Sequence, residues 1–202
     1  MTLIKERYNK WKLRKWHQKA GDIFFWVLIL MLLIPAPRKF VATGMNKALL
    51  HIRRPSMVDD VKAYRLTEAD YKWDIRDSDG IGTDPASLQG EVIFLNFWGT
   101  YCPPCIAEMP EIQSIYNDYS DKVRFILVSA EVPEKVQAFL TSRDYDLPAY
   151  YGGRNMPEPF AVRSIPTTFL ISRDGKIVMK KVGAADWDSK AMRKIFDQLL
   201  VR

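Results

Sequence analysis

The sequence predicts an α/β fold, a mixed central β-sheet flanked by helices, preceded by a single N-terminal transmembrane helix. Segments with the pattern of buried strands alternate with segments whose apolar residues have helical spacing, as in α/β proteins. One long apolar run with basic residues on both sides lies near the N-terminus. The chain has 202 residues and 48% hydrophobic content, which is enough for one domain with its own core and some additional sequence.

The apolar run at residues 21–37 is the first predicted element. Its uninterrupted apolar part extends from Ile23 to Ile34. A helix extended to residues 20–37 would be roughly 27 Å long, close to the ~30 Å of a hydrocarbon core. We therefore expect a transmembrane anchor at 21–37. Residues 1–20, with seven basic side chains and one acidic side chain, are expected to form a basic cytoplasmic tail.

A cleaved signal peptide is the alternative interpretation of this run. Cleavage requires small residues soon after the apolar part, and that region instead contains Pro35, Pro37, Arg38 and Lys39. An uncleaved anchor is therefore favoured. Residues 38–63 are expected to be a juxtamembrane linker. Its apolar residues have helical spacing, which fits either an amphipathic helix on lipid headgroups or a linker helix packed on the domain.

The distribution of charge excludes one class of partner. The net charge is +6, but residues 41–202 contain 21 basic and 22 acidic side chains, so the excess lies at the N-terminus. Nucleic-acid binding needs basic residues gathered on the folded surface. We therefore expect no nucleic-acid partner.

Residues 64–202 are predicted to form the folded domain. The segment at 71–76 alternates weakly and leads to a turn at Asp79 and Gly80, whereas the run at 91–98 has the pattern of a central strand covered on both faces. After the strand at 71–76, the predicted elements follow the order β-α-β-α-β-β-α, with strands at 91–98, 123–129, 167–172 and 176–182 and helices at 103–119, 134–142 and 187–201. This order implies a mixed sheet with helices on both faces.

The only two cysteines, Cys102 and Cys105, lie at the end of the central strand with two prolines between them. Such a pair can be half of a zinc site, a structural cross-link or a redox centre. Zinc needs four ligands, and the two histidines, His17 and His51, precede the domain, so we expect no metal. A disulfide across so short a loop removes little entropy from the unfolded chain. The redox interpretation is favoured.

The motifs around this pair resemble those of a known family. WGTYCPPC after a buried strand, Glu108 three residues beyond the second cysteine, and the later SIPTTFLISRDGKIV resemble membrane-anchored thiol-disulfide oxidoreductases of the TlpA/ResA family. The resemblance covers about residues 64–202. It implies a thioredoxin fold for this domain, a redox-active Cys102–Cys105 disulfide and no cofactor.

The two cysteines are expected to have different roles. Cys102 precedes a helix, where free amides and the helix dipole favour a thiolate, so it is the expected nucleophile. Cys105, one turn further along, is expected to resolve the mixed disulfide. Glu108, if buried, would have a raised pKa and could exchange a proton with Cys105, a role that the resemblance supports. Asn96 replaces the aspartate of soluble thioredoxins, so the proton transfer is expected to depend on Glu108.

The remaining candidates would contact substrate. The resemblance implies that Pro166 is a cis-proline facing the sulfurs and that the Ile165 backbone pairs with an extended substrate strand. Tyr101 can supply an apolar platform for substrate. Trp98 is also a candidate, although its simplest interpretation is a core residue beside the site.

These expectations lead to one hypothesis about function. The protein would be a disulfide reductase on the periplasmic side of a bacterial inner membrane, acting on exported proteins in cytochrome c maturation or metal-site assembly and re-reduced by a membrane electron donor. The net direction of exchange is left open, because it depends on the redox potential and the partner. The alternatives are a peptide-binding module with a structural disulfide and a peroxide-reducing redoxin, although the PxxxT motif of that class is absent.

Overall fold

The computed structural model describes residues 25–26, 64–83, 85–152 and 156–201. The predicted tail, the predicted linker and all but two residues of the predicted anchor lie outside this part. Phe25 and Trp26 are helical and exposed. Among the described residues, no helix combines the length and the apolar character needed to cross a membrane.

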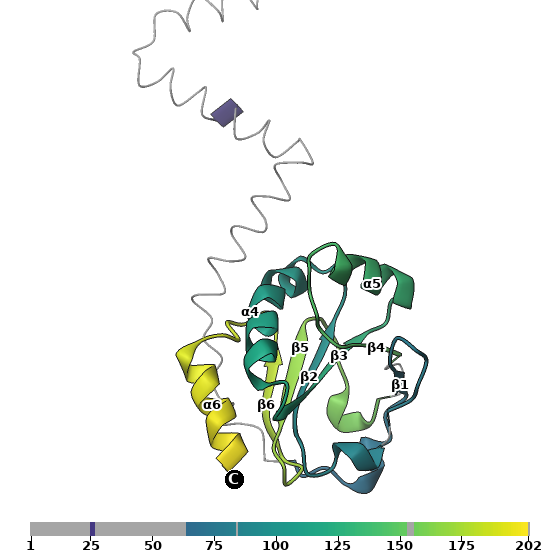
Figure 1. Cartoon of the computed structure of the whole chain (residues 1–202), viewed down its shortest axis with the longest axis vertical. Helices are drawn as coiled ribbons and strands as arrows, with labels where there is room; N and C mark the ends of the chain where they lie inside the picture. Colours follow the sequence, from purple (N-terminus) through teal and green to yellow (C-terminus); the bar gives the residue numbers. More distant parts are fainter. Residues whose placement is uncertain (1–24, 27–63, 84, 153–155, 202) are drawn as a thin grey trace, which may run out of the picture. The chain divides into compact units, whose positions relative to one another are not determined.

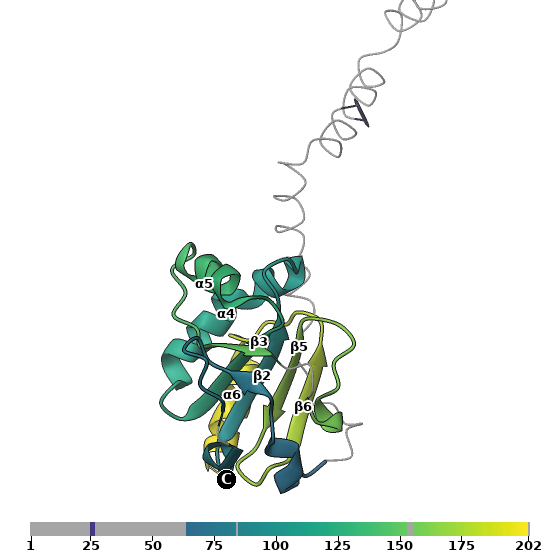
Figure 2. The same ribbon diagram turned by 90° about the vertical axis from the view of Figure 1, so that its right-hand side faces the viewer.

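A mixed six-stranded sheet with the order β1-β4-β3-β2-β5-β6 forms the centre of the domain (Figure 1). β2, β3 and β4 are parallel to one another, whereas β1, β5 and β6 pair antiparallel with β4, β2 and β5. Figure 2 shows β6 beside β5, at one edge of the sheet. The strands are β1 (Ile75–Arg76), β2 (Val92–Trp98), β3 (Val123–Ser129), β4 (Ala149–Gly152), β5 (Thr167–Ile171) and β6 (Ile177–Val182).

Helices cover both faces of the sheet, but the two faces differ. α4 (Pro103–Tyr119), α5 (Pro133–Thr141) and α6 (Lys190–Val201) contribute to one core cluster. The short 3-10 helices η1 (Glu68–Tyr71), η2 (Pro85–Leu88) and η3 (Glu158–Phe160) contribute to the other. In Figure 1, α4 and α6 lie next to each other on the same side of the sheet. The predicted flanking by helices is therefore confirmed, with 3-10 helices on one face.

Strand β2 forms the centre of both clusters, and all seven of its residues are buried. Alternate side chains point to opposite faces of a strand. Phe94 accordingly packs among the α-helices, whereas Leu95 belongs to the cluster beneath the 3-10 helices. The Phe94 ring has its centroid 5.1 Å from that of Trp187 and 5.2 Å from that of Phe125. The segment that contains both cysteines follows directly after this buried strand.

The strongest sequence patterns gave accurate bounds. The helix over 103–119 and the strand over 123–129 are observed as predicted. Cys102 caps the helix, and prolines occupy its first turn, where a missing amide hydrogen breaks no helical hydrogen bond.

Two predictions about elements need correction, and one strand was missed. The predicted strand at 71–76 is limited to Ile75 and Arg76, since Tyr71 ends η1. The last helix begins at Lys190 and not at Trp187, whose backbone N–H donates instead to a side chain of α4. Strand β4 was not predicted. It is only four residues long, and such a run is difficult to distinguish from a loop without its neighbour β3.

Removing the ring of Phe94 should destabilise the domain strongly. We expect Phe94→Ala to lower the free energy of unfolding by about 3–5 kcal/mol, because the fully buried ring would leave a cavity between three aromatic partners. Urea denaturation of the oxidised chain measures this loss. Val201→Ala, at an 89% exposed position, should stay within about 0.5 kcal/mol. If Phe94→Ala lowers the free energy of unfolding no more than Val201→Ala does, the Phe94 ring does not hold this core together.

Candidate active site

Cys102 and Cys105 form a disulfide at the junction of β2 and α4. Cys102 has 6% of its surface exposed and Cys105 has none. The Cys105 backbone N–H, the first amide hydrogen after two prolines, donates to Cys102 Sγ at 3.3 Å. Among the described residues, no group of three His, Cys, Asp or Glu side chains could hold a metal ion.

The loop before Cys102 is fixed by a residue that the sequence analysis missed. The Thr100 backbone N–H and hydroxyl donate to the two carboxylate oxygens of Glu131, at 2.5 and 2.9 Å. Glu131 also forms an ion pair with Lys135, and these interactions hold the pKa of its carboxyl below the ordinary range, although its burial acts in the opposite direction. Tyr101 is 66% exposed beside the disulfide, with the Lys135 ammonium 5.7 Å from its ring centroid. Contact of Tyr101 with a substrate stays a prediction.

The segment that contains Pro166 lies against the sulfur of Cys102. The Ile165–Pro166 peptide bond is cis, as expected from the resemblance. The Ile165 carbonyl oxygen lies 3.7 Å from Cys102 Sγ. Strand β5 begins at Thr167, directly after this bond, so β5 positions the cis-proline segment. Contact of Ile165 and Pro166 with a substrate stays a prediction.

Glu108 lies completely inside the core, one helical turn beyond Cys105 on α4. Its Oε1 accepts from Asn96 Nδ2 at 3.1 Å. Its Oε2 accepts from the Ala185 backbone N–H at 3.2 Å and from Trp187 Nε1 at 2.9 Å. Burial raises the pKa of Glu108 to about 8, against the three hydrogen bonds, which favour the carboxylate. The condition set by the sequence analysis, burial of Glu108, is therefore met, and the raised pKa expected in that case is observed.

Two of the groups that hold Glu108 could not be expected from the sequence. Ala185 contributes a backbone amide, which no side-chain pattern reveals. Trp187 is the first residue of the helix predicted over 187–201, whereas in the structure it lies before α6 and is completely buried. Asn96 cannot transfer a proton itself, but its side-chain amide donates to Glu108.

Trp98 lies in the core at the end of β2. Only 2% of its surface is exposed, and its ring centroid is 5.6 Å from that of Phe139 on α5. This position agrees with the simpler interpretation of Trp98 as a core residue. Its contact with substrate stays a prediction.

Comparison with known proteins assigns the chain to a family. The family model described as redoxin matches residues 60–200. The chain belongs to the redoxin family. The thiol-disulfide oxidoreductase ResA of Halalkalibacterium halodurans is 38% identical over 112 residues, 54% of this redoxin and 64% of that protein. The match thus covers less than two thirds of that relative.

Longer matches agree with this assignment. ResA of Oceanobacillus iheyensis is 28% identical over 184 residues, which are 88% of this redoxin and 90% of the relative. Among solved structures, a thiol:disulfide interchange protein of the thioredoxin family from Chlorobium tepidum aligns with a TM-score of 0.53 and 21% identity, over 73% of this redoxin and 98% of that chain. At this identity the structure shows only the fold. The predicted thioredoxin-like fold is confirmed.

The raised pKa of Glu108 should make the stability of this redoxin depend on pH. Between its ordinary pKa of 4.5 and about 8, the folded chain holds a proton on Glu108 that the unfolded chain releases. The contribution of this proton to the free energy of unfolding is fully present below pH 4.5 and is lost as the pH rises through about 8.

A neutral amide at position 108 should remove this dependence. Urea denaturation of oxidised wild type and Glu108→Gln measures the difference in their free energies of unfolding at each pH. The free energy of unfolding of wild type minus that of Glu108→Gln should fall by up to about 1.4 kcal/mol per pH unit between pH 4.5 and about 8. A difference that stays constant from pH 5 to 8 would contradict a protonated Glu108.

Proposed function

We propose that this redoxin is a thiol-disulfide oxidoreductase that works mainly as a disulfide reductase. The main observation in favour is the disulfide between Cys102 and Cys105 at the start of α4, next to the cis-proline segment. A disulfide buried in the core would be inert, but Cys102 retains some exposure and the exposed Tyr101 lies directly before it. The names of the ResA relatives agree with this activity.

The first step in the reducing direction is an attack by reduced Cys102. Its thiolate attacks one sulfur of the substrate disulfide, and a mixed disulfide forms while the other substrate sulfur leaves as a thiolate and takes a proton. The Cys105 backbone N–H, which points at Cys102 Sγ, and the start of α4 would both stabilise the Cys102 thiolate.

The second step releases the substrate. Cys105 gives its proton to the Glu108 carboxylate, and the resulting thiolate attacks Cys102 Sγ. A Cys102–Cys105 bond forms, the mixed disulfide breaks, and the substrate leaves with two electrons more than it had as a disulfide. The oxidised state then has a proton on Glu108, which agrees with the pKa of about 8 in this disulfide form. Re-reduction by a membrane electron donor supplies two electrons and returns the proton to sulfur.

The substrates we propose are extended segments of exported proteins, such as apocytochrome c or metal-site assembly factors. An extended strand could pair with the Ile165 backbone beside Cys102, with the exposed Tyr101 ring as its apolar platform. The apolar run at 21–37 and the basic residues before it support an anchored protein whose domain faces the periplasm.

The experiment that tests the activity uses a peptide with one internal disulfide. Reduced Cys105→Ser should form a stable 1:1 adduct through Cys102, because the resolving thiol is missing, and mass spectrometry would show the added peptide. Cys102→Ser should form none, since Cys105 is completely buried. If folded Cys105→Ser forms no adduct, the oxidoreductase proposal is wrong and the disulfide is structural.

The proposed periplasmic location of the domain can be tested independently of its activity. A phosphatase that is active only outside the cytoplasm, fused after Arg202, should be active in intact bacteria. Removal of residues 1–37 should abolish that activity, because the fusion would remain in the cytoplasm. An inactive full-length fusion that is produced at normal levels would contradict the periplasmic assignment.

A further inference from the structure

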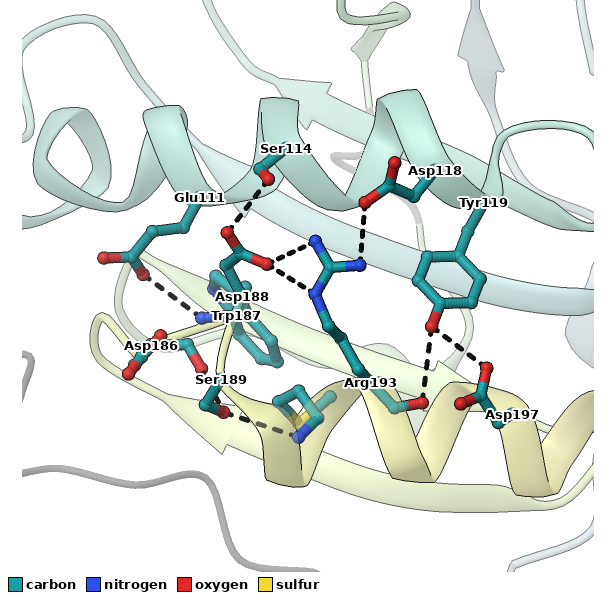
Figure 3. Close-up of polar contacts among 11 residues, drawn as sticks. Glu111, Ser114, Asp118, Tyr119, Asp186, Trp187, Asp188, Ser189, Arg193 and Asp197 are labelled. Carbon is teal, nitrogen blue, oxygen red and sulfur yellow. Dashed lines mark hydrogen bonds and ion pairs between the residues drawn. The ribbon is translucent and has the colours of Figure 1, made fainter.

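The segment between β6 and α6 is joined to helix α4 at several points, and Figure 3 shows most of them. The Trp187 backbone N–H donates to Glu111 Oε2 at 3.2 Å. Asp188 accepts from the Ser114 hydroxyl at 2.9 Å and from Arg193 Nε at 2.7 Å. These contacts fix the backbone on both sides of the Trp187 indole.

Arg193 on α6 completes this connection. Its guanidinium forms ion pairs with Asp188 and with Asp118 on α4, and these raise its already high pKa further. The Trp187 side chain beneath them is completely buried, with its ring edge-on to Phe94. The indole therefore has little freedom to turn, and its N–H points at Glu108 Oε2 at 2.9 Å.

The two oxygens of Glu108 have different surroundings. Oε2 accepts from two donors, the Trp187 indole and the Ala185 amide, and neither donor can act as an acceptor. A proton on Oε2 would face both of these N–H groups. Oε1 has one partner, the amide of Asn96. A proton on the carboxyl group is therefore more stable on Oε1.

The Asn96 side-chain amide can form a hydrogen bond with Glu108 Oε1 whether Oε1 is protonated or not. In the structure, Asn96 Nδ2 donates to Glu108 Oε1 and to Thr168 Oγ1, whereas the buried Asn96 Oδ1 has no hydrogen-bond partner among the described residues. A half-turn of the amide group exchanges its oxygen and nitrogen. Asn96 Oδ1 would then accept the proton of a protonated Oε1 and also the hydroxyl hydrogen of Thr168.

We propose that Trp187 is a positioning residue for Glu108: its indole N–H holds Oε2 and leaves Oε1, opposite the adaptable Asn96 amide, as the oxygen that gains and loses the proton. This inference rests on the proposed function, in which Glu108 exchanges that proton with Cys105. Trp187 itself touches neither the sulfurs nor substrate in this account. It acts by fixing the carboxyl group and by favouring its ionised form.

The pH at which Glu108 ionises depends on few other groups. On α4, Glu111 raises the pKa of Glu108 by charge repulsion. β2 and β5 present the neutral Asn96 and Thr168, and the Cys105 sulfur does not titrate in the disulfide form. The oxidised chain is therefore the suitable state in which to follow Glu108 alone.

The test compares two buried tryptophans in the oxidised full-length chain. Carboxyl ¹³C NMR, assigned with Glu108→Gln, gives the ionisation midpoint of Glu108. Trp187→Phe should move this midpoint upward by about one pH unit, since the carboxylate loses a donor. Trp73→Phe should leave it unchanged, because the Trp73 indole donates to the Asp70 carbonyl in the other core cluster. A midpoint that does not move in folded Trp187→Phe overturns the inference.

A second measurement needs no core variant. In wild type, the Trp187 indole proton resonance should titrate with the same midpoint as Glu108, and Glu108→Gln should abolish that titration. The Trp73 indole resonance in the same spectrum should not move in this pH range. A pH-independent Trp187 resonance overturns the inference and leaves the oxidoreductase proposal intact. Absence of a peptide adduct on Cys105→Ser overturns that proposal, whatever the Glu108 midpoint.

Discussion

The arrangement of this domain depends on one carboxyl group, that of Glu108, placed inside an apolar core. An ionised carboxylate without partners there would cost several kcal/mol. Three donors from two parts of the chain reduce this cost: Asn96 on β2, and Ala185 and Trp187 in the segment before α6. They do not cancel it, since the pKa stays near 8. Glu108 can therefore exist in both protonation states close to neutral pH, as a proton carrier needs.

The same elements place the sulfurs. Strand β2 ends directly before the loop that leads to Cys102. Glu131, two residues after the end of neighbouring β3, holds that loop through Thr100. β5 pairs with the other side of β2 and brings the Ile165 carbonyl next to Cys102 Sγ. The nucleophile, the resolving cysteine and the proton carrier therefore share one rigid support. Tyr101 is exposed beside Cys102, whereas Cys105 and Glu108 are completely buried.

The sequence predicted best those features that depend on residues close together in the chain. The bounds of α4 and β3 follow from apolar spacing and from prolines at a helix start, and the roles proposed for Cys102 and Cys105 follow from their order at that start. Contacts between distant segments could not be predicted in this way. The Ala185 amide, the Trp187 indole and the Glu131 carboxylate reach the site only through tertiary packing. The predicted anchor at 21–37 stays a prediction, because most of it lies outside the described residues.

The most direct test of a Cys102–Cys105 pair served by Glu108 is stopped-flow reaction with an aromatic disulfide that releases a coloured thiolate. Attack by Cys102 gives the first release, and resolution by Cys105 gives the second. We predict that Glu108→Gln leaves the first phase nearly unchanged and slows the second by about 10- to 100-fold near pH 7, because Cys105 loses its proton acceptor. A second phase with the rate and pH profile of wild type would contradict the role of Glu108.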